Sequence, residues 1–124
     1  MENELRLTEL GHTWLLDIDG TLLKHNGYKD GGDEVLEGVE EFFNSLREED
    51  TVVLLTARSE DKRAETEKFL RMAGIRYDHI IFGLPTGERI LVNDDKPSGR
   101  CMGYALNKRR DEKLEINCVI DAEL

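Results

Sequence analysis

The chain has 124 residues, the usual length of one compact domain, and we predict a single domain over residues 1–124 with its core at about residues 12–107. It carries 27 acidic and 17 basic residues, a formal net charge of -10 that disfavours nucleic acid and anionic membrane surfaces as partners. Its two cysteines lack CxxC spacing, which argues against a disulfide framework and a zinc site. No apolar run is long enough for a membrane span, so we expect a cytoplasmic protein.

The first half of the chain alternates between apolar runs and helical patterns. Residues 13–18 form a short apolar run that ends in acidic residues and glycine, as expected of a buried parallel strand. The glycine-rich residues 24–33 indicate a loop. Apolar side chains recur at helical spacing over residues 33–47 and predict an amphipathic helix, and the leucine and β-branched run at residues 51–55 predicts a second buried strand.

The alternation continues through the middle of the chain. Ser59 is placed to cap a helix that ends near Gly74, and residues 79–82 and 89–92 have the composition of two further short strands. Strands that alternate with helices imply right-handed crossovers and a parallel sheet. The predicted fold class is therefore α/β, a three-layer Rossmann-like parallel sheet with helices on both faces.

The pattern weakens beyond residue 93. Residues 104–106 are compatible with an edge strand, and residues 116–120 with a last strand or an appended tail. The basic run at residues 108–110 is most simply a solvated loop, because acidic residues follow it at once. The role of residues 108–124 is left open.

Polar clusters follow three of the predicted strands, at residues 17–21, 56–58 and 93–96. The carboxyl ends of parallel strands lie side by side, and the alternation of side chains along a strand directs Asp17 and Asp19 to the same face. Asp94 or Asp95 would join them from a neighbouring strand. Several carboxylates at one sheet edge favour a hard divalent cation with oxygen ligands, so we predict bound Mg²⁺.

These clusters resemble the haloacid dehalogenase (HAD) superfamily, whose first motif is an apolar strand followed by Asp-x-Asp-Gly-Thr. Here that motif is residues 15–21, the family's strand ending in Thr or Ser is residues 52–56, and its strand with an acidic pair is residues 90–95. The resemblance covers about residues 13–97 and implies a phosphomonoester hydrolase that works through an aspartyl phosphate.

The resemblance also implies roles for the matching residues. Asp17 would be the nucleophile, and Asp19 the general acid and base. Mg²⁺ would be held by Asp17, by Asp94 and by the main-chain carbonyl of Asp19, with Asp95 as an alternate ligand. The Thr56 hydroxyl and the Ala57 N–H would hold the phosphate oxygens of a phosphorylated substrate.

The chain departs from the family at the motif that supplies a lysine or arginine beside the nucleophile. The corresponding position is Leu84, so Arg89 and Lys96 are the candidate substitutes, and Lys96 is preferred because it follows the predicted strand at residues 89–92. Arg58 would add a contact to phosphate or substrate. The short intervals leave no room for a cap domain, which implies a bulky substrate or a homo-oligomer that closes the site, with residues 24–33 as the candidate lid.

A second class of function stays open beside the hydrolase. A non-catalytic phosphate-binding or phosphoacceptor signalling domain also uses acids, Thr and Lys around Mg²⁺ at strand ends. Receiver domains of that kind place the acidic pair before the phosphoacceptor, whereas here the paired Asp motif occupies the first strand. A phosphomutase ranks lower, because it normally needs a cap.

Overall fold

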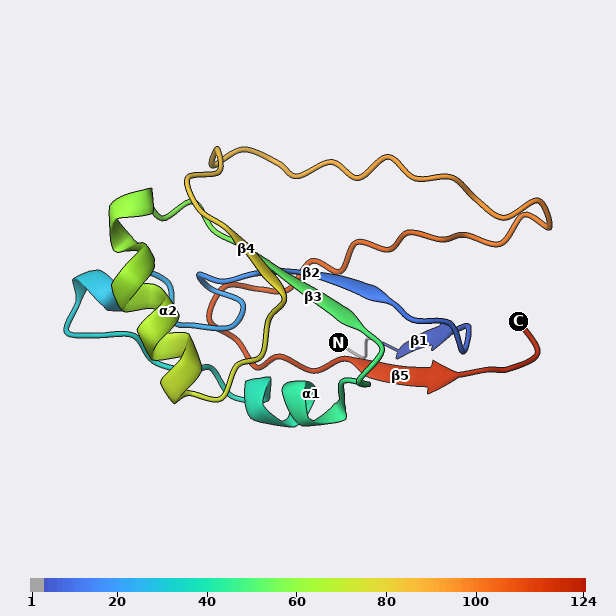
Figure 1. The fold of residues 1–124 in the computed structure, drawn as a ribbon, viewed down its shortest axis with the longest axis horizontal. Coiled ribbons are helices and arrows are strands. Elements are labelled where there is room, and N and C mark those ends of the chain that lie inside the picture. The colour runs from blue at the N-terminus through green and yellow to red at the C-terminus, as the bar shows by residue number, and fades with distance from the viewer. Residues whose placement is uncertain (1–3) are drawn as a thin grey trace.

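The computed structural model describes residues 4–124. Its helices and strands are drawn in Figure 1 and come in the order β1 (Glu4–Leu7), β2 (Thr13–Asp17), the 3-10 turn η1 (Gly27–Lys29), α1 (Val39–Ser45), β3 (Thr51–Leu55), the 3-10 turn η2 (Glu60–Lys62), α2 (Arg63–Met72), β4 (His79–Ile81) and β5 (Asn117–Ile120).

Two small parallel sheets make up the strand structure. The three-stranded sheet has the order β2-β3-β4, and its register pairs Leu16 with Leu54 and Leu54 with Ile80. The other sheet pairs β1 with β5. The strands predicted at residues 13–18, 51–55 and 79–82 and their parallel order are confirmed, and the fold is mixed α/β. Among residues 4–124, no helix has the length and apolar character needed to cross a membrane.

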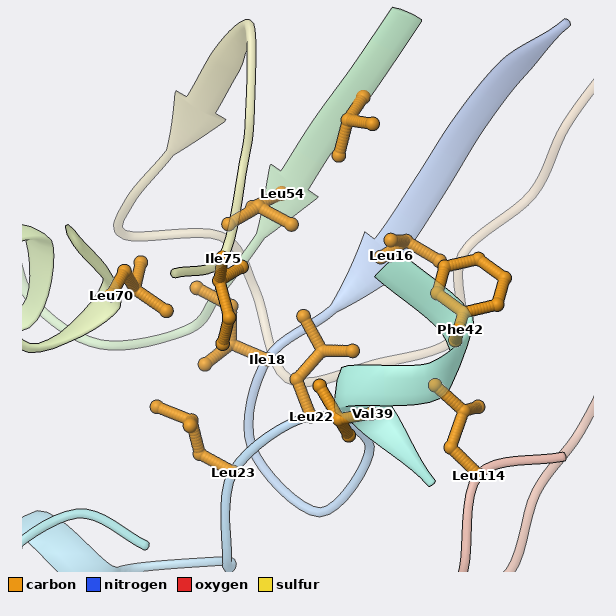
Figure 2. Close-up of a cluster of buried hydrophobic side chains, with 11 residues drawn as sticks. Leu16, Ile18, Leu22, Leu23, Val39, Phe42, Leu54, Leu70, Ile75 and Leu114 are labelled. Atoms are coloured by element: carbon orange, nitrogen blue, oxygen red, sulfur yellow. The ribbon is translucent and has the colours of Figure 1, made fainter. Parts of the chain in front are cut away.

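The helices cover one face of the three-stranded sheet. Alternate residues of its strands face α1 and α2, and the Trp14 ring meets the Phe42 ring edge to face at 5.1 Å. The buried apolar side chains between sheet and helices are Leu16, Ile18, Leu22, Leu23, Val39, Phe42, Val52, Leu54, Leu70, Ile75 and Leu114 (Figure 2).

The other face of this sheet is open, which differs from the predicted arrangement with helices on both faces. Leu15 and Ile81 point to that face and are 49% and 45% exposed. The reason lies in the strand order: successive right-handed crossovers that advance in one direction along a sheet place their helices on the same face. The three-layer arrangement is therefore not confirmed in residues 4–124.

Helix α1 is shorter than the predicted helix over residues 33–47. Residues 33–38 are held outside the helix, because Val35 forms an antiparallel bridge with Leu23 and the Asp33 carboxylate binds Arg58. Gly38 has a φ of 88°, and a Cβ there would lie 2.0 Å from the carbonyl oxygen of Leu114. Tertiary contacts thus override the helical pattern in its first turn and a half.

Residues 85–107, here called the arm, contain no helix or strand. Figure 1 shows the orange arm leaving the end of β4, turning back beyond the opposite end of the sheet and returning. Every residue from 85 to 99 is exposed. The strand predicted at residues 89–92 is wrong, as is the edge strand at residues 104–106, since a β-prone run needs a neighbouring strand to pair with.

The C-terminal segment beyond the arm returns to the body of the molecule. Leu114 is buried, and its N–H donates to the Glu37 carbonyl at 2.9 Å. The last strand predicted at residues 116–120 is present as β5, although its partner β1 was not expected. Residues 108–124 therefore belong to the fold and are not an appended tail.

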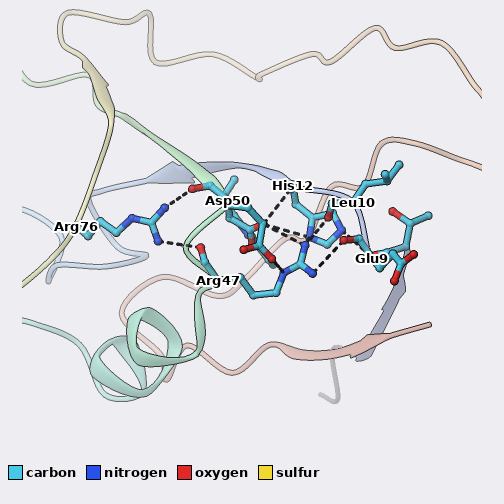
Figure 3. Close-up of polar contacts among 9 residues, drawn as sticks. Glu9, Leu10, His12, Arg47, Asp50 and Arg76 are labelled. Carbon is cyan, nitrogen blue, oxygen red and sulfur yellow. Dashed lines mark hydrogen bonds and ion pairs between the residues drawn. The ribbon is translucent and has the colours of Figure 1, made fainter. Parts of the chain in front are cut away.

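A polar network fastens the start of β3 to the loop before β2 (Figure 3). The Asp50 carboxylate accepts hydrogen bonds from the His12 N–H at 2.9 Å and from Trp14 Nε1 at 3.1 Å, and it pairs with Arg47. Arg76 donates to the carbonyls of Arg47 and Asp50. Burial alone would raise the pKa of Asp50, but these hydrogen bonds and charges outweigh it and hold that pKa below its usual value.

Candidate functional site

Asp17 ends β2 and carries the most accessible carboxylate at this edge of the sheet. Thr21 Oγ1 donates to Asp17 Oδ2 at 3.1 Å, and Arg89 Nη1 donates to Oδ1 at 2.8 Å. The turn that follows brings Thr21 back, because the N–H groups of residues 21, 22 and 23 all donate to the Ile18 carbonyl. The Asp17 and Arg89 side chains are 36% and 38% exposed, so their ion pair contributes little stability and leaves Asp17 open to a ligand.

Asp19 lies beside the end of β3 and is fully engaged by it. Its Oδ2 accepts a hydrogen bond from Thr56 Oγ1 at 3.1 Å, and its Oδ1 accepts one from Arg58 Nη2 at 2.8 Å. The Arg58 Nε–H is shared between the two oxygens at 3.1 and 3.2 Å. The strand ends therefore bring Asp17, Asp19, Thr56 and Arg58 together, as the sequence predicts.

Arg58 is a buried hub whose side chain is only 1% exposed. Besides Asp19, its guanidinium donates to both oxygens of Asp33 at 2.7 and 3.1 Å and to Thr66 Oγ1 at 2.9 Å. The Tyr28 ring lies against it, with the ring centroid 4.1 Å from Arg58 Cζ. Burial alone would lower the pKa of Arg58, but the hydrogen bonds to Asp33 and Asp19 outweigh it and raise that pKa above its usual value.

These contacts bear on the predicted phosphate ligands. All five N–H groups of Arg58 are already directed at Asp19, Asp33 and Thr66, so none is left for a phosphate. The Thr56 hydroxyl is likewise committed, since it donates to Asp19 and accepts from the Arg58 N–H at 2.9 Å. Ala57 is exposed, and its N–H has no acceptor within residues 4–124. The Ala57 N–H is the predicted donor that stays free for an oxyanion.

The basic residue beside Asp17 is Arg89, whereas the sequence reasoning preferred Lys96. That preference assumed a strand at residues 89–92 with Arg89 at its far end. Because the strand does not form, Arg89, which lies on the arm eight residues after the end of β4, reaches Asp17, while Lys96 is exposed farther along the arm. Of the two candidate basic residues, Arg89 is therefore the one that contacts Asp17.

The predicted magnesium ligands are not gathered at one place. Asp94 and Asp95 are exposed on the arm, whereas Asp17 ends β2 and Asp19 follows it. Within the described residues, no group of three His, Cys, Asp or Glu side chains is arranged to hold a metal ion. The Asp17, Asp94 and Asp95 carboxylates as arranged do not form the predicted site with the main-chain carbonyl of Asp19, and Mg²⁺ stays a prediction from the sequence.

Sequence reasoning missed several residues that shape this site. Thr21 could have been predicted from the sequence, since it is the last residue of the Asp-x-Asp-Gly-Thr motif, four residues after Asp17. No local pattern in the sequence indicates the roles of Asp33 and Tyr28, because their partner Arg58 is at least 25 residues away in the chain. Thr66 faces Arg58 from α2, where its position in the helical pattern indicates only the buried side.

We compared the chain with protein families, curated proteins and solved structures. No protein-family profile, curated protein or solved structure matches the chain.

Proposed function

We propose that the chain hydrolyses phosphomonoesters through an aspartyl phosphate formed on Asp17, as its resemblance to the haloacid dehalogenase superfamily implies. The observation that carries this proposal is the environment of the Asp17 carboxylate. It is open to solvent, it is oriented by Thr21, and it lies 2.8 Å from the Arg89 guanidinium. An oriented carboxylate beside a cation suits attack on a phosphate that would otherwise repel it.

The reaction divides into two steps. In the first, an oxygen of Asp17 forms a bond to phosphorus, the bond to the ester oxygen breaks, and that oxygen leaves with a proton donated by Asp19. In the second, water attacks the aspartyl phosphate, gives a proton back to Asp19, and releases phosphate with the Asp17 carboxylate restored. Arg89 and the free N–H of Ala57 would hold the phosphate oxygens in both steps.

This scheme demands one rearrangement. Asp19 can exchange a proton with a leaving group only if an oxygen is turned to the substrate, and both of its oxygens are bound to Thr56 and Arg58. Substrate binding would therefore have to draw Asp19 away from Arg58, which keeps Asp33 as a second carboxylate partner.

The test is Asp17→Asn, assayed on p-nitrophenyl phosphate with and without Mg²⁺. We expect a folded protein whose turnover falls by at least about 1,000-fold, because removal of a covalent nucleophile leaves only binding and electrostatic effects. The matched control is Glu48→Gln, which neutralises an exposed carboxylate between α1 and β3. Turnover of Asp17→Asn within tenfold of the wild type would remove Asp17 from the mechanism.

The second candidate function is that of a phosphoacceptor domain, and the hydrogen bonds from Arg58 to Asp19 favour it. If Asp19 stays bound to Arg58, no carboxylate activates water and an aspartyl phosphate on Asp17 would persist. Mass spectrometry after incubation with acetyl phosphate separates the two functions: an adduct that lasts for minutes without turnover indicates the phosphoacceptor, and steady release of phosphate indicates the hydrolase.

A further inference from the structure

The basic run at residues 108–110 lies against the turn that follows Asp17. Figure 1 shows the orange-red chain after the arm curving beside the blue segment after β2. The Gly20 carbonyl accepts hydrogen bonds from the Asp111 N–H at 2.9 Å and from Lys108 Nζ at 3.1 Å. The Cγ atom of Arg110 lies 3.2 Å from where a Cβ on Gly20 would stand. A run that looks like a solvated loop in the sequence is thus fixed at the rim of the candidate site.

The backbone of this run is held in a defined conformation. Asp111 has a φ of 62°, in the left-handed region that few non-glycine residues adopt, although aspartate adopts it more readily than most. Its carboxylate accepts a hydrogen bond from the His25 N–H at 2.7 Å, so it is turned toward the loop at residues 24–33. The Glu112 N–H closes the turn on the Arg109 carbonyl at 3.3 Å.

The three basic side chains differ in their contacts with the rest of the chain. Lys108 is used in the fold, because its ammonium also donates to the Arg109 carbonyl at 2.8 Å, and burial lowers its pKa against the pull of Asp111 and Glu112. Arg109 and Arg110 are exposed, and neither side chain has a hydrogen-bond or ion-pair partner within residues 4–124. Every other arginine of the described chain has a polar partner; these are Arg6, Arg47, Arg58, Arg63, Arg71, Arg76, Arg89 and Arg100.

Unpaired arginines are unexpected in a chain with 27 acidic and 17 basic residues. Arginine presents a planar fork of N–H groups that matches a phosphate or carboxylate, and it is the usual residue for such contacts. Arg109 and Arg110 place two positive charges beside the Gly20 turn, ahead of the acidic Asp111 and Glu112. An anion held there would lie near a group bound at Asp17.

We propose that Arg109 and Arg110 form a second anion subsite, and that the substrate is a phosphomonoester bearing another phosphoryl group. This inference rests on the proposed function, since it assigns the scissile phosphate to Asp17. Arg109 and Arg110 bind the phosphoryl group that is not cleaved, and they determine specificity through that contact.

The experiment compares Arg109→Ala/Arg110→Ala with Lys62→Ala/Lys68→Ala, which removes two positive charges from η2 and α2. The substrates are fructose 1,6-bisphosphate and fructose 6-phosphate. We expect the ratio of their kcat/KM values to fall by about tenfold in the arginine variant, which corresponds to the loss of about 1.4 kcal/mol of binding. The ratio should stay within twofold of the wild type in the lysine variant.

Calorimetry with inorganic pyrophosphate and inorganic phosphate gives a readout that needs no turnover. We expect the wild type and the lysine variant to bind pyrophosphate more tightly than phosphate, and the arginine variant to lose this preference. If no ester is hydrolysed but this loss is seen, the hydrolase proposal fails and the anion subsite stands. An equal preference in both variants, or an unchanged ratio of kcat/KM, overturns the subsite.

Discussion

Replacing Asp33 by alanine tests whether Arg58 is held by two carboxylates. The Asp33 and Arg58 side chains are 8% and 1% exposed, and two hydrogen bonds of 2.7 and 3.1 Å join them. Loss of one partner of a buried ion pair costs about 3–5 kcal/mol, because the remaining charge is left without compensation. Arg58 keeps Asp19, so we expect the low end of that range, about 3 kcal/mol.

The assay is urea unfolding followed by circular dichroism. With a slope of about 1–3 kcal/mol per molar urea, a loss of about 3 kcal/mol lowers the midpoint by roughly 1–3 M. The control is Asp30→Ala, an exposed carboxylate three residues earlier in the same loop, whose removal should change the free energy of unfolding by less than about 0.5 kcal/mol. Equal midpoints for the two variants would show that Asp33 does not hold Arg58 in solution.

Two further predictions concern the sheet and the polar network. Leu54→Ala, in the covered face of the sheet, should lower the free energy of unfolding by about 2–5 kcal/mol. Leu15→Ala, in the open face, should lower it by less than about 1 kcal/mol. Similar losses for the two variants in urea unfolding would contradict the one-sided packing. The lowered pKa of Asp50 means that its contribution to stability is present above its ordinary pKa of 3.8 and is lost as pH falls through the lower folded value. Thermal unfolding between pH 6 and pH 2 should therefore show a steeper acid loss for the wild type than for Asp50→Asn, and parallel curves would refute this.

Local patterns in the sequence predicted the central part of the fold well. Strands β2, β3 and β4 and helix α2 follow from short apolar runs and helical spacing, which depend on residues close together in the chain. The convergence of Asp17, Asp19, Thr56 and Arg58 follows from the parallel order of two neighbouring strands.

The features that were missed depend on contacts between distant residues. Residues 33–38 of the predicted helix at residues 33–47 are not helical, because Asp33 binds Arg58 and Gly38 lies against Leu114. The strand at residues 89–92 has the right composition but no partner, so the acidic pair at residues 94–95 does not reach Asp17. The pairing of β1 with β5 joins residues more than 100 positions apart, which no local pattern signals.

The unpaired arm has a consequence for how the protein behaves at high concentration. Its β-prone residues 90–92 leave main-chain N–H and C=O groups available to another molecule, which is the hazard of an uncovered strand edge. The arm itself carries three acidic and three basic residues, so only the negative charge of the rest of the chain keeps molecules apart. Salt shortens the range of that repulsion to about 8 Å at physiological ionic strength. Solubility should therefore decrease as ionic strength rises, and dilute buffers are the conditions in which the protein stays dispersed.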